Sequence, residues 1–239
     1  MKKIINLAMS NSFPMLSAIM EDYLKAIYSL QNETDGRVRT SVLAEYIDVE
    51  QSTVTSMMKK LSERDFVQYE PYKGVELTDT GVPIALEIIR HHRLLERYLT
   101  DHLEYDWAEV HDEADRLEHH ISSKFADRIA EQLGQPAVDP HGDPIPTADL
   151  DVSGAKDGER LADHQVGDSV QIVRVPDTDP DLLRYLSKHG IHPGTVVDVV
   201  EIAPFGMVTL DPDNGDGPVA LPEEVARSIS TQSLTQSSH

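Results

Sequence analysis

The 239-residue sequence contains no cysteine, so it can form neither a disulfide nor a thiolate metal site. It also has no run of about 18 apolar residues, and its opening string MKKIINLAMS meets Pro14 too soon for a signal peptide. These absences predict a cytoplasmic protein with no membrane partner. Any metal would be held by nitrogen, oxygen or thioether ligands, which favours Mn, Fe, Co, Ni or Zn bound by histidine and carboxylate.

Basic residues are scarce: 21 Lys and Arg stand against 42 Asp and Glu, which gives a formal net charge of −21. Such an excess of acid argues against a nucleic-acid partner. The charge is unevenly spread, however, because residues 139–239 hold 18 acidic and 6 basic residues whereas residues 37–64 hold 4 acidic and 5 basic. The near-neutral stretch is where DNA contacts are expected, and the acidic remainder predicts a halophile, by origin a haloarchaeal protein.

The near-neutral stretch has the pattern of a helix-turn-helix. Apolar spacing predicts a helix over 15–31, then two short helices over 41–47 and 51–64 with a break at Asp48-Val49. Two short strands, FVQYE and GVELT, follow as a wing. The alternative for the helix at 51–64 is an ordinary solvated helix. The predicted DNA contacts are Arg39, Gln51, Ser52, Thr53, Thr55, Ser56, Lys59, Lys60 and Lys73.

The rest of the chain changes from helical to β-rich. A long helix is predicted over 79–104, and one or two more within VHDEADRLEHHISSKFADRIAEQL. A segment rich in Pro, Gly and Asp then predicts a loop or linker, and short β-branched runs between 166 and 226 predict a small SH3-like sheet. The fold class expected is therefore a mainly α N-terminal part with a winged helix-turn-helix, followed by a small all-β domain.

Histidines and carboxylates concentrate in VHDEADRLEHH, residues 110–120. On one continuous helix, Val110, Ala114, Leu117 and Ile121 would form the packing stripe. The adjacent stripe would hold His111, Asp115, Glu118 and His119. His92 and Glu96 repeat the spacing of four on the preceding helix, and Asp22 borders a buried face of the first helix.

Each of these residues has a plainer interpretation as a core histidine or a solvated charge. Buried together without metal, however, the carboxylates would repel one another and be costly to desolvate. Catalysis is not favoured, since no Glu is followed by His three residues on and HExxH, GxSxG and Walker motifs are absent. The cluster therefore predicts a metal-sensing regulator rather than an enzyme.

Several strings in this sequence resemble, in the same order, the diphtheria-toxin-repressor family of metal-dependent transcriptional regulators, closely over 15–135 and more loosely over 136–226. They are MEDYLKAIY (20–28), VEQSTVTSMMKKL (49–61), GVELTDTG (74–81), HHRLLERYL (91–99), VHDEADRLEH (110–119) and DPHGDPIP (139–146). The resemblance implies a regulatory metal site of Asp22, Asp115, Glu118 and His119. It implies an ancillary site of His92, Glu96 and His111, which an acidic residue of DTDPD (177–181) can join.

The resemblance also divides the chain into domains. They are a flexible N-terminus (1–14), a winged helix-turn-helix domain (15–78), a helical dimerisation and metal-binding domain (79–138), a linker (139–165), an SH3-like domain (166–227) and a disordered tail (228–239). The function implied is a repressor of metal-uptake genes that binds a palindromic double-stranded DNA operator as a homodimer.

Mn(II) is the expected metal and Fe(II) the alternative. Asp22 and Asp115 stand where iron-responsive members of the family carry methionine and cysteine, and hard oxygen ligands favour Mn(II). Lys25 departs from the manganese-responsive branch, which has a glutamate there. Two other functions stay open: a cytoplasmic metal buffer or carrier, and a winged-helix protein that needs no metal.

Overall fold

The computed structural model describes residues 16–34, 36–152, 158–177, 179–204, 206–213, 215 and 217–234. It divides into two compact units. Unit 1 holds the described residues up to His92 with Glu118–Phe125 and Pro146–Asp151, and unit 2 holds Arg93–Leu117, Ala126–Ile145 and the residues from Val152 onward. The division therefore falls within the long helix α5 (Gly81–Leu103). The predicted flexible segment 1–14 lies outside the described residues.

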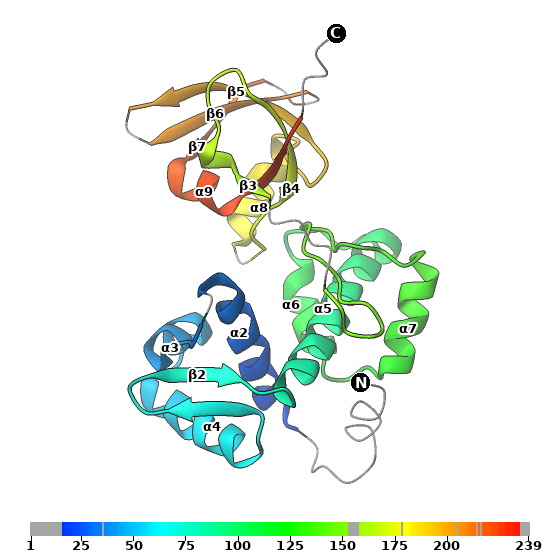
Figure 1. Cartoon of the computed structure of the whole chain (residues 1–239). Helices are drawn as coiled ribbons and strands as arrows, with labels where there is room; N and C mark the ends of the chain where they lie inside the picture. Colours follow the sequence, from blue (N-terminus) through cyan, green and yellow to red (C-terminus); the bar gives the residue numbers. More distant parts are fainter. Residues whose placement is uncertain are drawn as a thin grey trace. The chain divides into compact units, whose positions relative to one another are not determined.

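Unit 1 contains the predicted winged helix-turn-helix (Figure 1). Its elements are α2 (Ala18–Thr34), α3 (Thr40–Ile47), α4 (Gln51–Glu63), β1 (Val67–Glu70) and β2 (Gly74–Leu77). The predicted break is confirmed at Asp48, whose φ of 55° is left-handed and whose backbone N–H donates to the carbonyls of Ala44 and Glu45. This αL residue ends α3 and turns the chain into α4.

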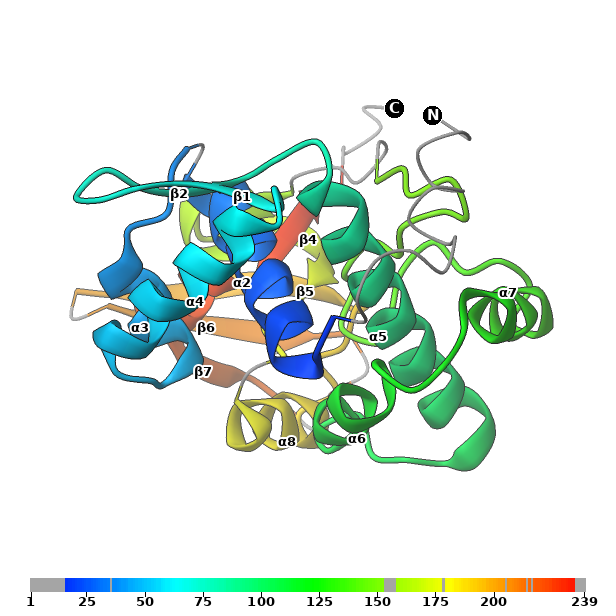
Figure 2. The ribbon, with the colours of Figure 1, turned by 90° about the horizontal axis from the view of Figure 1, so that it is seen from below.

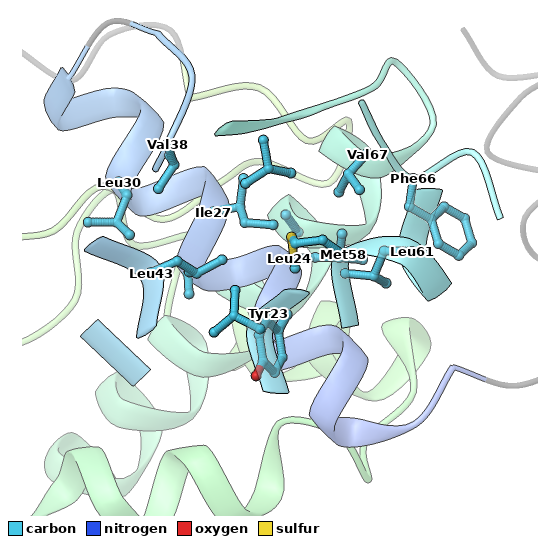
Figure 3. Close-up of a cluster of buried hydrophobic side chains, with 14 of the residues drawn as sticks. Tyr23, Leu24, Ile27, Leu30, Val38, Leu43, Met58, Leu61, Phe66 and Val67 are labelled. Atoms are coloured by element: carbon cyan, nitrogen blue, oxygen red, sulfur yellow. The ribbon is translucent and has the colours of Figure 1, made fainter. Parts of the chain in front are cut away.

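The core of unit 1 forms where α2, α3, α4 and the wing meet (Figure 3). Val54, Met58 and Leu61, the predicted inner stripe of α4, are fully buried. Burial of each such side chain stabilises the fold by about 1.5–3 kcal/mol. Because α4 is anchored by this stripe, its opposite face of short polar side chains and lysines is held towards solvent.

The segment at 110–133 forms two helices, α6 (Val110–Leu117) and α7 (Ser123–Gln132). The predicted continuous helix through Ile121 is wrong, since α6 ends at Leu117 and residues 118–120 form a turn. The Ser122 side chain accepts a hydrogen bond from the N–H of Phe125 and so begins α7. Glu118 and His119 therefore occupy a turn rather than the helical stripe assigned to them.

Unit 2 contains a six-stranded antiparallel sheet in the order β3-β8-β4-β5-β6-β7. Figure 2 shows β4, β5, β6 and β7 of this sheet. The strands are β3 (Glu159–Arg160), β4 (Ser169–Arg174), β5 (Val196–Ala203), β6 (Met207–Pro212), β7 (Val219–Pro222) and β8 (Ser230–Ser233). The predicted small all-β domain is confirmed. It also holds a 3₁₀ turn, η1 (Leu161–Asp163), and two unpredicted helices, α8 (Pro180–Lys188) and α9 (Glu223–Ser228). Asp179 starts α8 by accepting from the N–H groups of Asp181 and Leu182.

Two predicted boundaries of the C-terminal part are wrong. Residues 230–233, assigned to a disordered tail (228–239), form β8 and pair with β4 and β3, while 235–239 lie outside the described residues. The predicted linker (139–165) ends in β3 and η1, and it begins with a buried loop that contains Asp139 and His141. The polar composition of both segments suggested chain exposed to solvent, but both segments form hydrogen bonds within the fold. No described helix is long and apolar enough to cross a membrane.

Candidate metal centres and DNA-binding surface

Three of the predicted regulatory ligands come together in unit 1. Asp22 on α2 and Glu118 and His119 in the turn after α6 form what we name the α2 cluster. His119 Nε2 lies 2.8 Å from Asp22 Oδ1 and 3.4 Å from Glu118 Oε1. The turn at 118–120 makes this possible, because it directs both side chains towards α2.

Glu21, which no spacing or motif in the sequence singles out, also contacts the α2 cluster. Its Oε2 lies 2.6 Å from His119 Nδ1. Burial raises the pKa of Glu21 and of Asp22, although His119 acts in the opposite direction. The neighbouring Glu118 adds to the rise at both carboxyls. A cation in the α2 cluster would relieve this repulsion.

Lys25 reaches the same carboxylate from α2. Its Nζ lies 2.8 Å from Glu118 Oε2, 3.2 Å from Oε1 and 3.1 Å from His92 Nδ1. Glu118 is 1% exposed, and its Oε2 is also 2.6 Å from His92 Nδ1. The ammonium thus balances a buried carboxylate at the edge of the α2 cluster. Sequence spacing alone left open whether this lysine reached the site.

Unit 2 carries a second set, the α5 cluster, made of Glu96, His111 and Asp177. His111 Nδ1 lies 3.2 Å from Glu96 Oε1 and 3.7 Å from Asp177 Oδ2. Asp177 is the residue of the string DTDPD that the structure brings to this cluster. Asp115, predicted for the regulatory site, lies 3.6 Å from His111 Nε2. His92, predicted for the ancillary site, belongs to unit 1 and stands four residues before Glu96 on α5.

The donor atoms of both clusters are imidazole nitrogens and carboxylate oxygens. Neither cluster contains sulfur, and each offers at least three donors close together. This donor set fits a divalent first-row metal, and the carboxylate share favours Mn(II) or Fe(II) over metals that prefer thiolates. The residues present therefore fit a metal in each cluster.

The predicted DNA contacts lie on the outer face of α4 and around it. Ser52, Thr53, Ser56, Lys59 and Lys60 are exposed. The other predicted contacts have partners within the chain or stand outside α4. Thr55 Oγ1 donates to the Gln51 carbonyl, Gln51 Nε2 donates to Thr40 Oγ1, Lys73 pairs with Glu70, and Arg39 is exposed before α3.

Models of known families match almost the whole chain. Residues 15–75 match "Iron dependent repressor, N-terminal DNA binding domain" and residues 78–147 match "Iron dependent repressor, metal binding and dimerisation domain". Residues 159–232 match "FeoA domain", which corresponds to the sheet of unit 2.

Relatives and solved structures give the same assignment. The chain is 33% identical to the iron-dependent repressor IdeR of Mycobacterium tuberculosis over 225 residues, which are 90% of this chain and 96% of IdeR. It is 29% identical to the diphtheria toxin repressor of Corynebacterium jeikeium over 236 residues, with 90% and 96% covered. A manganese-dependent transcriptional repressor in complex with manganese is similar in structure, with a TM-score of 0.82 and 40% identity over 90% of this chain and 100% of that one. The chain therefore belongs to the diphtheria-toxin-repressor family of iron-dependent repressors, whose members are metal-dependent DNA-binding transcriptional repressors.

Proposed function

We propose that this protein is a Mn(II)-responsive repressor of metal-uptake genes, which binds a palindromic operator as a homodimer. The single observation that carries the proposal is the α2 cluster. It joins Asp22, on the first helix of the DNA-binding lobe, to Glu118 and His119 more than ninety residues later in the chain. An ion held there would act directly on the helix that supports α3 and α4.

The residues of the α2 cluster supply the regulatory response. Without a metal, Asp22 and Glu21 face the Glu118 carboxylate, and their pKa values are raised because burial and this repulsion disfavour the charged forms. Asp22, Glu118 and His119 would hold a divalent ion, whose positive charge would offset this repulsion. Metal binding would then favour the arrangement of α2 that presents α4 to DNA, and its free energy would become a bias towards the DNA-competent state.

Operator recognition would use the outer face of α4. Ser56 and Thr53 offer hydroxyl groups of suitable length for base edges in a major groove, whereas Lys59 and Lys60 offer charge to phosphates. Their exposure supports this division of roles. A metal buffer or carrier would not require such a surface.

Metal preference rests on the donors at positions 22 and 115. Both are carboxylates, and hard oxygen donors suit Mn(II), the weakest binder of the first-row series at N/O/S sites. We expect wild type to bind its operator at lower free Mn(II) than the double variant Asp22→Met with Asp115→Cys, and Fe(II) to show the opposite order. The measurement is operator binding against buffered free metal, under anaerobic, high-salt conditions.

The operator for this experiment can be selected from random duplex DNA in the presence of Mn(II). The single variant Asp112→Asn, an exposed carboxylate on the same helix as Asp115, is the matched control. A wild type that responds to Fe(II) but not Mn(II) would overturn the metal assignment alone. A wild type that binds metal but no DNA would overturn the repressor and leave the buffer or carrier.

A further inference from the structure

Trp107, the only tryptophan of the chain, lies where the helical part of unit 2 meets its sheet. It belongs to the short connection between α5 and α6, and its indole contacts two histidine rings from other segments. The His141 ring, in the loop after α7, is stacked with it at a centroid distance of 5.5 Å. The His192 ring, in the turn before β5, is tilted against it at 4.5 Å. Three segments far apart in the chain therefore meet at this one side chain.

Packing holds this indole rather than a hydrogen bond from its ring. Trp107 Nε1 is buried and has no hydrogen-bond partner among the described residues. A buried indole N–H usually finds an acceptor, so the ring contacts have to outweigh its absence. Trp107 also packs against the apolar core of the sheet, which includes its neighbour Ala108 together with Leu183 and Ile191. The connection between α5 and α6 is therefore part of the core of the SH3-like sheet.

The turn around Trp107 determines where α6 begins. The Asp106 side chain accepts a hydrogen bond from the N–H of Ala108, and the Asp106 carbonyl accepts from the N–H of Val110. An aspartate that accepts from a nearby backbone N–H in this way fixes the first turn of a helix. His111 of the α5 cluster is the second residue of α6, so its direction follows from this turn.

Trp107 also fixes the chain just after β4, through His141. The carbonyl oxygen of Trp107 accepts a hydrogen bond from Nε2 of His141 at 2.8 Å. The carbonyl oxygen of His141 accepts in turn from the N–H of Val175 at 3.0 Å. Asp177 follows Val175 by two residues. The loop that stacks on Trp107 therefore also sets the position of Asp177, the residue that the sheet part contributes to the α5 cluster.

The α5 cluster does not hold itself together in the metal-free chain. Glu96 Oε1 and Asp177 Oδ2 both approach His111 Nδ1, at 3.2 and 3.7 Å. One ring nitrogen carries at most one proton to donate, and the two carboxylates repel each other. Because Asp177 belongs to the sheet part, this repulsion acts to separate the sheet from α5 and α6. A contact outside the cluster has to oppose it.

The ion pair that bridges the same region is too exposed for this task. Arg184 Nη2 on α8 lies 3.3 Å from Glu109 Oε1, in the turn that carries Trp107. Both side chains are half or more exposed to solvent, and a pair of this kind contributes little to stability. The ring contacts of Trp107 are partly buried and are not screened by salt. They are the stronger candidate for the anchor.

We propose that Trp107 is a positioning residue: its indole, between His141 and His192, docks the SH3-like sheet on α5 and α6 and so holds Asp177 at His111. The indole offers no metal ligand, and it acts by preorganisation, since an incoming ion then meets donors that are already assembled. The effect on ion affinity rests on the proposed metal response. The docking itself is a property of the metal-free chain.

The first test measures docking without metal. The chain has no cysteine, so Arg128→Cys on α7 and Val200→Cys on β5, both at exposed positions, provide the two sites for spin labels. Double electron–electron resonance then gives the distance distribution between them. We expect a narrow distribution in the labelled parent and in Trp107→Phe, which retains a ring, and a broad one in Trp107→Ala. Tyr105→Ala is the matched control, because Tyr105 is an exposed aromatic residue in the same connection.

The second test is a double-mutant cycle on Mn(II) affinity, measured by calorimetric titration of chains without labels. All chains carry Glu118→Ala, so that the α2 cluster does not contribute. Asp177→Asn should weaken Mn(II) binding about tenfold when Trp107 is present but less than about twofold in Trp107→Ala, because Asp177 is then no longer held at the cluster. Trp107→Phe should restore the tenfold loss. A general loss of stability would not remove the dependence on Asp177.

Two results would overturn the proposal. One is a distance distribution in Trp107→Ala as narrow as that of the labelled parent. The other is an equal loss for Asp177→Asn with and without Trp107, including no loss in either. Neither readout involves DNA, so a chain that binds no operator would count against the proposed repressor and not against the docking role of Trp107.

Discussion

The α2 cluster of unit 1 and a group in unit 2 made of Glu96, Asp139 and His141, which we name the buried triad, are built from the same chemistry but differ in exposure. Glu96 lies on α5, and Asp139 and His141 lie in the loop after α7. In the α2 cluster the Asp22 side chain is 49% exposed and His119 10%, whereas no member of the buried triad exceeds 2%. An ion in the α2 cluster can exchange with solvent, as a sensor of free metal requires. The buried triad offers no such exposed donor, because its three side chains are enclosed within unit 2.

The two groups also differ in their built-in cations. Lys25 places its ammonium within 3.2 Å of both Glu118 oxygens, on a flexible four-carbon chain. Arg93 is held by a carbonyl and by Asp143, and it stays 3.6 Å from Asp139. A lysine can withdraw when a metal arrives, whereas a fixed guanidinium cannot. The α2 cluster is thus arranged for exchange of one cation for another.

The largest expected effect follows from loss of Glu118. Glu118→Ala should weaken metal-dependent operator binding by more than about 100-fold, since even outer-shell partners of metal ligands contribute 10- to 100-fold. Glu113→Ala is the control, because Glu113 lies on α6 and pairs with the exposed Arg116. The measurement is operator affinity at saturating and limiting Mn(II).

Metal-dependent operator binding equal to that of Glu113→Ala would show that Glu118 is not a regulatory ligand. His119→Ala should reproduce the effect of Glu118→Ala, since it removes another donor of the same cluster.

The second effect is a pH dependence confined to the metal-free protein. Burial and the Glu96 charge raise the pKa of Asp139 to about 8. Burial alone would lower the pKa of His141, but Glu96 and Asp139 outweigh it and raise this pKa to about 9. Both groups bind protons more tightly in the folded chain, so their stabilising contribution is present at low pH and is lost as pH rises through 8 and 9.

We therefore expect the free energy of unfolding of chelator-treated protein to fall between pH 6.5 and 9.5, by an amount on the order of 2 kcal/mol. Asp139→Asn should flatten this slope, because it removes one titrating group and the charge that raises the other. Denaturant melts across this range are the measurement. A slope unchanged in Asp139→Asn would show that the pH dependence arises elsewhere.

The sequence predicted the architecture of unit 1 well because its signals are local. Apolar spacing in α4 and the break at Asp48 determine where the helices lie, and family motifs supplied the ligand types. Glu21 and Asp177 could not be chosen in the same way. Each depends on a contact between residues distant in the chain, such as His119 with Glu21, which no periodicity records.

The predicted boundaries of the linker and of the C-terminal tail were wrong for a related reason. Residues 230–233 have polar sequence typical of a tail, yet they complete a sheet whose other strands supply their hydrogen bonds. Likewise, Asp139 and His141 lie in a string rich in Pro, Gly and Asp, yet both are buried. Hydrogen bonds with a backbone N–H group and with the Trp107 carbonyl satisfy their polar atoms there.

A third prediction sharpens the contrast between the two built-in cations. Lys25→Met should increase the Mn(II) affinity of the α2 cluster by about tenfold, or about 1.4 kcal/mol, because the ion no longer displaces an ammonium from Glu118. The metal-free variant should be less stable than wild type, since Glu118 loses its partner in a buried position. Calorimetric titration with Mn(II) and thermal melts measure the two effects.

Lys124→Met is the control for Lys25→Met, because Lys124 is an exposed lysine on α7. If Lys25→Met weakens Mn(II) binding, Lys25 supports the metal-bound arrangement rather than competing with it. An unchanged affinity would mean that the ammonium already stands apart from the ion's position.

The smallest effects are expected for substitutions on α4, the helix of unit 1 that we propose contacts DNA and not metal. Ser56→Ala or Thr53→Ala should reduce the preference for operator over random DNA by about 1 kcal/mol each, the lower end of the range for base contacts. Lys59→Ala should weaken binding to both DNAs alike and reduce the salt dependence of binding by about one phosphate contact.

Thr55→Ser provides a control, since Thr55 Oγ1 is already bonded to the Gln51 carbonyl. Binding isotherms at several salt concentrations distinguish the two classes. Equal losses on operator and random DNA for Ser56 and Thr53 would mean that α4 recognises phosphates alone, and sequence would then have to be read by another element of unit 1, such as the wing around Lys73.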